Sequence, residues 1–399
     1  MPKQTGPDCP SARATGADKV CRMPDCLTIR HFFWGSDIAL PRLWPFHDLM
    51  AARTDIDYRL HLVGRYPAAA SDISGRSYVT SGWRLPRRRP AEAWIIRGWN
   101  RPQLLWRSVT ANACRVPVVM WAESPGRTFE ATTPIQAARI AARERILPHL
   151  FRPYGERAVL LGTGAQAVAA LSTLAPASHV REFPYPNSVA DQVLYATTAL
   201  GRTRAAEDEQ MTRLLFVGSF SRTKAVDLII EACEQLWNAG ERFQMRYVGE
   251  GPLKHLLEAH AARHPEHAEL FPFATGPALT THYVDSSAVL LPSRRDGWGL
   301  TIHEGLAAGM PVLTTVACGA YRLVSANDCG TVVASNDVTA IADGIRATLD
   351  LARHSSDGKL AVRARAIAAG MTMPQLANEL IEHCQTAVRL ARSPEAISS

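Results

Sequence analysis

The strongest constraint on the fold is the alternation, along most of the chain, of short apolar runs with longer helix-like segments. Apolar runs of four to eight residues bounded by turn formers are typical of buried strands, and strands that alternate with helices build parallel α/β sheets. With 399 residues, the chain exceeds what one hydrophobic core usually organises, so two domains of about 150–200 residues are expected. In such open sheets, ligands bind at the carboxyl ends of the strands.

The pattern divides the chain into two α/β halves. For the first half it predicts strands at 27–34, 58–64, 93–99, 116–121, 158–161 and 180–185, and helices at 41–53, 102–114, 134–147 and 164–174. For the second half it predicts strands at 214–218, 243–248, 270–273, 288–292, 312–315 and 330–333, and helices at 224–239, 253–263, 278–285, 301–309, 338–352, 363–370 and 374–391. Turn formers and a polar stretch place the connection at about 186–211. We therefore expect a flexible tail at 1–25, an N-terminal domain at 26–190, a C-terminal domain at 211–373 and a final helix with tail at 374–399.

Composition and net charge limit the kinds of molecule that this protein is expected to bind. Apolar residues make up 47% and charged residues 20% of the chain, which is ordinary for a soluble globular protein. The net charge of +7 favours anionic partners such as nucleotide sugars, lipid phosphates or an acidic membrane face. Nucleic acid is disfavoured because zinc-finger spacing, RNA-binding aromatic signatures and dense basic helices are missing. The eight cysteines form no CxxC pair, so we expect reduced thiols and no metal. No apolar run reaches the length of a membrane span, and 1–25 lacks the apolar core of a signal peptide.

The most informative motif is the segment from Asp296 to Glu304, where an apolar strand ends, a glycine-containing loop follows and a helix begins. Gly297 and Gly299 permit a ligand to approach the backbone closely, and the free N–H groups of the helix start can bind a diphosphate. The two carboxylates can accept hydrogen bonds from sugar hydroxyls. The alternative is that both carboxylates only favour the helix N-terminus through its dipole.

The sequence segments around this motif resemble those of family 4 glycosyltransferases. DGWGLTIHEGLAAGMPV is similar to the family's E-x7-E segment, with Asp296 in place of the first Glu. RLLFVGSFSRTKAVDLIIEA resembles the family's first strand–loop–helix of the C-terminal domain, in which an Arg and a Lys meet the donor diphosphate. Lys224 matches that Lys, Ser219 stands where the Arg is usual, and Arg222 lies close enough in sequence to replace it. MRYVGEGPLKHLLEA resembles the family's V-G-x-G-P segment, and the likeness covers roughly 211–350.

The resemblance implies the GT-B fold: two Rossmann-like domains that face each other across a cleft, with the last helix crossing back to the first domain. It implies a hexosyltransferase that retains anomeric configuration, needs no metal or cofactor, and takes a nucleotide-diphosphate sugar as co-substrate. Lys224 would stabilise the leaving diphosphate, Asp296 would bind the donor sugar and Glu304 the ribose. The full expected donor site consists of Gly218, Ser219, Arg222, Lys224, Gly249, Gly251, Asp296, Gly297, Trp298, Gly299, Leu300 and Glu304.

The acceptor half departs most from the family. VVMWAESPGR ends a strand with Trp121 and Glu123, where Glu123 would orient an acceptor hydroxyl and Trp121 would stack on a sugar. The alternative is a buried Trp and a capping Glu. The apolar segment 31–49 is a candidate contact for a lipid-linked acceptor, or simply part of the core. Gly162 to Gly164 suggests a dinucleotide turn, but the third glycine of GxGxxG is missing.

The expected function is therefore transfer of a sugar to a glycan or lipid-linked acceptor during assembly of exopolysaccharide, capsule or lipopolysaccharide. The expected place is the cytoplasm, at the inner face of the cytoplasmic membrane through peripheral contact. Two alternatives remain open: a GT-B enzyme of another class, such as a nucleotide-sugar epimerase or a phosphorylase, and a degenerate protein that binds sugar or nucleotide without turnover.

Overall fold

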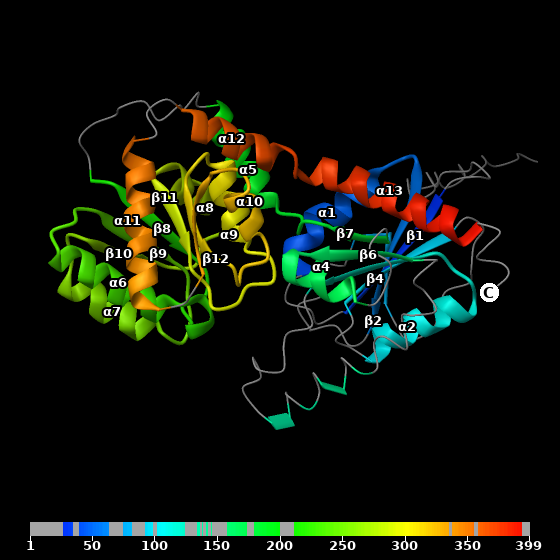
Figure 1. Ribbon diagram of the computed structural model, residues 1–399. Coiled ribbons are helices and arrows are strands. Elements are labelled where there is room, and N and C mark those ends of the chain that lie inside the picture. The colour runs from blue at the N-terminus through cyan, green and yellow to red at the C-terminus, as the bar shows by residue number, and fades with distance from the viewer. Residues whose placement is uncertain are drawn as a thin grey trace, which may run out of the picture.

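The protein folds into two parallel α/β units joined side by side (Figure 1). The computed structural model describes residues 27–34, 40–63, 75–81, 92–98, 102–123, 158–173, 179–199, 211–334, 337–354 and 358–392, with six single positions between 134 and 145. The predicted tail at 1–25 lies outside these residues.

Described strands of the first unit form a seven-stranded sheet in the order β3-β2-β1-β4-β5-β6-β7. Every pairing in it is parallel. Its strands are β1 (Leu27–Trp34), β2 (Ile56–Val63), β3 (Val79–Ser81), β4 (Glu92–Arg97), β5 (Val118–Glu123), β6 (Ala158–Thr163) and β7 (Val180–Glu182), and its helices are α1 (Leu40–Ala52), α2 (Pro102–Ala113) and α4 (Ala165–Leu171).

The second unit contains a six-stranded sheet over its described strands, in the order β10-β9-β8-β11-β12-β13, and again all pairings are parallel. Its strands are β8 (Arg213–Val217), β9 (Gln244–Val248), β10 (Ala268–Phe271), β11 (Ala288–Leu291), β12 (Val312–Thr315) and β13 (Gly330–Val333). The helical elements are η5 (Arg222–Lys224, 3-10), α6 (Val226–Asn238), α7 (Lys254–Arg263), α8 (Gly276–Val284), α9 (Leu300–Ala307), α10 (Tyr321–Ser325), α11 (Val338–His354) and α12 (Lys359–Ala369).

Helices cover both faces of each sheet, which explains the near-continuous apolar runs in the sequence. All residues of β4, β6, β11 and β12 are buried. Glu92 of β4 is a buried carboxylate with partners, because it accepts hydrogen bonds from Arg30 and from the indole of Trp94. A buried carboxylate is tolerable in such a layer only with partners of this kind.

Two helices tie the units together. The helix α5 (Ser188–Ala199) packs on α8 and α9 of the second unit, although it directly follows β7 of the first. The last helix, α13 (Met373–Arg392), leaves the second unit and packs on α1, β4, β5 and β6 of the first, as Figure 1 shows in red. The chain thus crosses between the two units twice.

The structure corrects several details of the sequence prediction. The connection predicted at 186–211 contains α5, because Asn187 accepts hydrogen bonds from the N–H groups of Val189 and Ala190 and so caps a helix rather than opening a linker. The short elements β3 and α10 were not predicted, and β10 begins two residues before the predicted strand at 270–273.

The apolar segment considered for lipid contact belongs to the core where it is described. Leu43, Phe46 and Met50 of α1 are completely buried, and Trp44 is 7% exposed. None of these four side chains is therefore free to meet a lipid. Among the described helices, none is both long and apolar enough to span a membrane.

Candidate functional site

The centre of the predicted donor site is a contact between two loops at the carboxyl edge of the second sheet. Lys224 ends η5 after β8, and Asp296 lies in the loop between β11 and α9. The Lys224 ammonium donates a hydrogen bond to Asp296 Oδ2, with side chains that are 25% and 14% exposed. Two predicted donor residues that are 72 positions apart in sequence thus form one partly buried ion pair.

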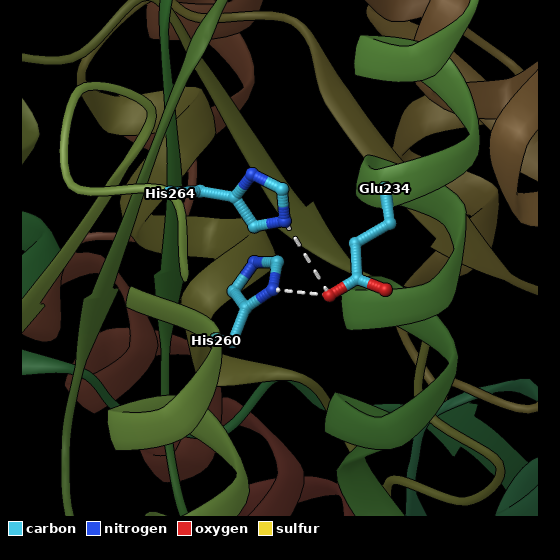
Figure 2. A group of neighbouring side chains, drawn as sticks. All are labelled: Glu234, His260 and His264. Carbon is cyan, nitrogen blue, oxygen red and sulfur yellow. Dashed lines mark hydrogen bonds and ion pairs between the residues drawn. The ribbon is translucent and has the colours of Figure 1, made fainter. Parts of the chain in front are cut away.

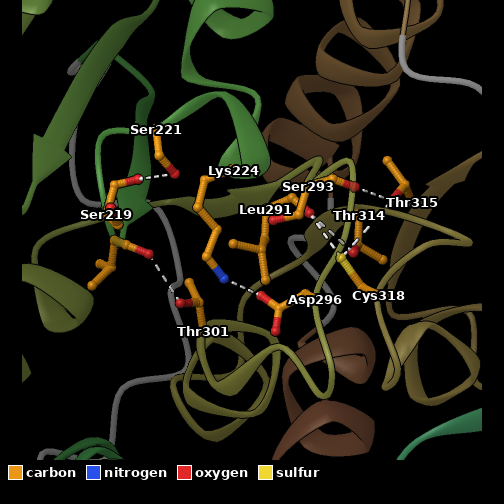
Figure 3. A network of polar contacts seen from close by, with 11 residues as sticks. Ser219, Ser221, Lys224, Leu291, Ser293, Asp296, Thr301, Thr314, Thr315 and Cys318 are labelled. Atoms are coloured by element: carbon orange, nitrogen blue, oxygen red, sulfur yellow. Dashed lines mark hydrogen bonds and ion pairs between the residues drawn. The ribbon is translucent and has the colours of Figure 1, made fainter. Parts of the chain in front are cut away.

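A second layer of hydrogen bonds fixes the Asp296 loop, as Figure 3 shows. The backbone of Asp296 donates to Ala317 O and accepts from Gly319 N, at 3.1 and 3.0 Å. Thr315 Oγ1 donates to Ser293 O at 2.7 Å, and the Cys318 thiol to Leu291 O at 3.5 Å. The turn after β12 therefore holds the carboxylate in place.

Arg294 is a further residue of this site that the sequence analysis missed. Its guanidinium donates to both carboxylate oxygens of Asp227 on α6, at 2.6 and 2.9 Å, and to Arg222 O at 2.6 Å. It therefore locks the β11–α9 loop to the loop that carries Lys224. Hydrogen bonds from Arg294 lower the pKa of Asp227 against the opposing effect of burial. The sequence contained a signal for this residue, because Arg294 lies three positions after the end of β11, between that strand and the Asp296 motif.

The predicted assisting cation, Arg222, is placed differently. Its side chain is 82% exposed, and its only ion pair within the described residues is with Asp227 at 3.8 Å. A long exposed arginine beside Lys224 can reach an anion without breaking a buried contact. Ser219 is also exposed at this edge.

Close backbone packing requires glycine at several positions of the predicted site. A Cβ on Gly249 would lie 2.0 Å from Gly218 O, and a Cβ on Gly251 2.6 Å from the backbone N and O of Phe220. The Gly-x-Gly turn after β9 therefore lets its backbone touch the loop after β8. Gly299 takes a φ of 93° as the residue before α9, a conformation that favours glycine.

Trp298, predicted to bind the donor, is a core residue. It is 4% exposed, and its backbone oxygen accepts from Ala320 N at 2.8 Å. Leu300, the first residue of α9, is partly buried against the same core. The Trp298 ring thus packs in the core beneath the loop instead of facing a ligand.

Glu304 is buried and already has protein partners. It is 5% exposed; one oxygen accepts from Asn187 Nδ2 at 2.9 Å and the other from the Tyr283 hydroxyl. Burial raises the pKa of Glu304, and these hydrogen bonds oppose that rise. In this arrangement Glu304 joins α9 to the start of α5, and its contact with a ribose stays a prediction.

The first unit contributes Glu123, the last residue of β5. Its side chain is 50% exposed. A Cβ on Gly297 would lie 2.9 Å from Glu123 Oε2, so the carboxylate rests against the Asp296 loop. The predicted acceptor-side and donor-side residues therefore meet. Trp121 does not face solvent: it is completely buried, and its indole donates to Thr163 at 2.8 Å, so the predicted sugar stacking is wrong.

A glycine-to-glycine contact brings the two sheet edges together. The α4 residue Ala165 donates its N–H to Gly319 O at 3.1 Å, and Gln166 Nε2 donates to Val316 O at 2.6 Å. A Cβ on Gly164 would lie 2.6 Å from Gly319 Cα, and one on Gly319 would lie 2.0 Å from Gly297 O. The Gly-x-Gly turn after β6 is thus an interdomain contact, and no dinucleotide is needed to explain it.

Arg97, the last residue of β4, is the most unusual residue near this junction. Its side chain is 6% exposed, its Nη2 lies 3.6 Å from Glu123 Oε1, and its buried Nη1 has no hydrogen-bond partner among the described residues. The guanidinium lies 4.1 Å from the ring centroid of Trp121 and 4.9 Å from that of Tyr185. Aromatic faces stabilise a cation, but they leave its N–H groups unsatisfied.

Two histidines near Arg97 add no negative charge to its surroundings. His31 and His47 both hydrogen-bond the Tyr58 hydroxyl, at 2.9 and 2.7 Å, and within the part of the chain that the structure describes the buried Nε2 atom of each has no partner. Burial, with a contribution from Arg97, lowers the pKa of His31 well below 6.5 and that of His47 to about 3. Both rings are therefore neutral near pH 7, and neither adds a charge beside Arg97.

Comparison with known proteins gives this geometry a context. Residues 202–366 match the family model of the group 1 glycosyl transferases. A putative colanic acid biosynthesis glycosyltransferase of Escherichia coli is 29% identical over 144 residues, which are 34% of this chain and 35% of that protein. The lipopolysaccharide glucosyltransferase WaaG of Escherichia coli is 27% identical over 150 residues, or 38% and 40%. The chain thus spans little more than a third of the length of these curated relatives.

Solved structures match over both units. Anabaena HepE in complex with UDP aligns with a TM-score of 0.63 at 13% identity, over 90% of this chain and 100% of that chain. Sucrose-phosphate synthase from Thermosynechococcus elongatus aligns with a TM-score of 0.66 at 16% identity, over 91% and 99%. This is the GT-B fold. The predicted pair of Rossmann-like domains is confirmed, and the group 1 description fits the part of the GT-B chain that holds Lys224, Asp296 and Glu304. The finer assignment to family 4 stays a prediction.

Proposed function

We propose that this protein is a retaining glycosyltransferase that moves a sugar from a nucleotide-diphosphate sugar to a glycan or lipid-linked acceptor. One observation carries the proposal: Lys224 and Asp296 come together at the carboxyl edge of the second sheet, inside the segment that matches group 1 glycosyl transferases. Open α/β sheets bind ligands at this edge. The solved structure of HepE, which shares the fold, contains UDP.

The chemistry of the donor side follows from charge. Departure of the nucleoside diphosphate builds negative charge on its terminal phosphate, and fixed cations at that point lower the barrier. Lys224 is held at the edge by Asp296, and the exposed Arg222 is free to approach. The N-terminus of α9 adds partial positive charge. These groups supply the charge neutralisation that a metal would otherwise provide, so we propose a metal-independent transfer.

The acceptor side points to an acidic substrate. Arg97 has a buried N–H group that finds no partner in the described ranges of the chain, and it shares a weak ion pair with Glu123, which in turn touches Gly297 of the donor loop. A carboxylate or phosphate on the acceptor would satisfy the guanidinium and place a hydroxyl near Glu123. The names of the relatives, which include colanic acid and lipopolysaccharide enzymes, agree with an acidic glycan acceptor.

We place the activity in assembly of exopolysaccharide, capsule or lipopolysaccharide, at the inner face of the cytoplasmic membrane. The net charge of +7 suits a peripheral contact with anionic lipid. The competing functions are a phosphorylase, an epimerase and a degenerate binder. Ser219 stands at the position of the family's Arg and so removes one cation from the donor site. This difference is the feature that favours a degenerate binding protein.

A donor-turnover assay separates these functions. The protein would be incubated with UDP-, GDP-, ADP- and dTDP-sugars, with and without acidic oligosaccharides, while NMR follows nucleotide release and the anomeric signal of the product. The proposal expects release from one nucleotide family, faster with acceptor, and a product with the donor's anomeric configuration. Inverted product would contradict retention. Sugar 1-phosphate formed only with added inorganic phosphate would indicate a phosphorylase, and binding without turnover a degenerate protein.

A further inference from the structure

A second cluster of polar side chains lies far from the loops that carry Lys224 and Asp296. Glu234 of α6 faces His260 of α7 and His264 just after it, as Figure 2 shows. The helices α6 and α7 lie on the side of the second unit that is turned away from the first (Figure 1). Nothing in the proposed transfer uses these three residues.

The geometry of the cluster suits a small cation. One ligand atom from each residue lies within 4.8 Å of the other two. Glu234 Oε1 is 3.1 Å from His260 Nδ1 and 3.7 Å from His264 Nε2. Ligand atoms bound at about 2.1 Å to a tetrahedral cation lie about 3.4 Å apart, so small shifts would place all three around one ion.

Neighbouring residues hold His260 in a binding orientation. Its ring stacks on Trp237, with centroids 5.3 Å apart and planes 16° apart. Tyr247 OH lies 3.4 Å from His260 Nε2. When the imidazole proton moves from Nδ1 to Nε2, the ring can donate to Tyr247 and present Nδ1 to a cation, the arrangement of many metal-binding histidines.

We propose that Glu234, His260 and His264 form a binding site for a divalent transition metal of the zinc class, which joins α6 to α7. Two imidazoles and one carboxylate favour zinc over magnesium, which prefers oxygen ligands. Side chains of Glu234 and His264 are 30% and 25% exposed, which leaves a side of the cluster open for a water ligand. The role is structural and independent of sugar transfer.

Arg263 is the competitor for this site. Its Nη2 donates to Glu234 Oε1 at 2.5 Å, and its side chain is 55% exposed. A bound cation would take that oxygen, and Arg263 would move into solvent. Removal of Arg263 should therefore strengthen metal binding, whereas a cluster built only as an ion pair would lose stability and gain no affinity.

The test is calorimetric titration of the full chain, stripped with chelator, with zinc chloride, followed by cobalt absorption in the visible range. The variants are His264→Ala, the isosteric Glu234→Gln, Arg263→Ala, and as a control His255→Ala, an exposed histidine of the same helix. We expect one zinc per chain in wild type and His255→Ala, at least about tenfold weaker binding in His264→Ala and Glu234→Gln, and tighter binding in Arg263→Ala.

Two results would overturn the proposal. One is no saturable binding in both wild type and Arg263→Ala. The other is binding that His264→Ala and Glu234→Gln leave unchanged, which would assign the metal to other residues such as the cysteines. Circular dichroism of Glu234→Gln checks that lost binding is not lost folding.

Discussion

Lys224 and Asp296 lie on two loops that follow different strands, yet the lysine ammonium donates directly to the aspartate. The cation expected to meet the diphosphate therefore pairs with the carboxylate expected to meet the sugar. In the proposed reaction, the diphosphate competes with Asp296 for the Lys224 ammonium, and hydroxyls of the donor sugar bind the carboxylate.

Asp296→Asn should separate nucleotide binding from turnover. The variant keeps the shape of the loop and releases Lys224 from a pair worth about 1 kcal/mol, so the affinity for the free nucleoside diphosphate should rise about fivefold. Sugar transfer should fall about 100-fold because the variant loses a charged partner of the donor sugar. Calorimetry and rate measurements on this variant and on Asp343→Asn, whose side chain is 68% exposed, would check both effects. An equal loss of binding and turnover in Asp296→Asn would mean that the carboxylate only shapes the loop.

Gly319→Ala should disturb the junction between the two units. A Cβ there would lie 2.0 Å from Gly297 O, which overpacks the contact with Gly164. We expect a loss of roughly 1–3 kcal/mol in the free energy of unfolding, together with a larger radius of gyration in solution scattering. The control is Gly370→Ala, at a φ of −71° and with its nearest Cβ neighbour at 3.3 Å. A Gly319→Ala protein with unchanged melting temperature and radius would show that the units do not rest on this turn.

Comparison of Glu304→Gln with wild type at different pH values tests the raised pKa of the buried Glu304 carboxyl. Because burial raises the folded-state pKa of Glu304 above its unfolded value, its contribution to stability is complete below the unfolded pKa and is lost as pH rises through the folded pKa. Glutamine does not ionise, so the melting temperature of Glu304→Gln relative to wild type should be higher at pH 8 than at pH 5. Glu258→Gln, at an exposed position of α7, should show no such trend. A difference that is constant with pH would contradict the raised pKa.

Arg97→Met tests whether the guanidinium is kept for a ligand. Its partner Glu123 is half-exposed, so removal of Arg97 leaves no buried charge behind. We expect about 1 kcal/mol of added stability, since an incompletely paired buried cation is costly. Donor hydrolysis should continue, whereas transfer to acidic oligosaccharides should fall at least about tenfold, because a charge-assisted contact is lost. Melting curves and paired hydrolysis and transfer assays would check this, and loss of stability together with hydrolysis would make Arg97 a structural residue.

Much of this architecture is readable in the sequence because parallel strands buried on both faces leave a clear apolar pattern. The strands at 27–34, 312–315 and 330–333 have the predicted bounds. The positions of Asp296 and Glu123 at the carboxyl edges could be predicted because each follows or ends such a strand, whereas Lys224 was singled out by the family resemblance; the roles of all three stay predictions.

The remaining features depend on contacts between distant segments. Arg97 looks like the end of an apolar strand, and only the fold shows that three aromatic rings surround it and that one of its own N–H groups has no partner among the residues described. Turn residues before α5 resemble a linker until Asn187 is seen as a cap bonded to Glu304. The glycines at 249 and 251 suggest a ligand, although their backbones touch a neighbouring loop.

The most direct test of the central claim is nucleotide binding by wild type, Lys224→Ala and Lys254→Ala. Lys254 is a matched lysine on α7 that pairs with Glu250 at 3.1 Å, and its side chain is 42% exposed. Calorimetric titration with UDP, GDP, ADP and dTDP should find one nucleoside diphosphate that binds wild type and Lys254→Ala equally. It should bind Lys224→Ala about 10- to 100-fold more weakly, because a charge-assisted phosphate contact is lost. Equal affinity in Lys224→Ala, or no binding of any nucleotide to wild type, would contradict the donor site described above.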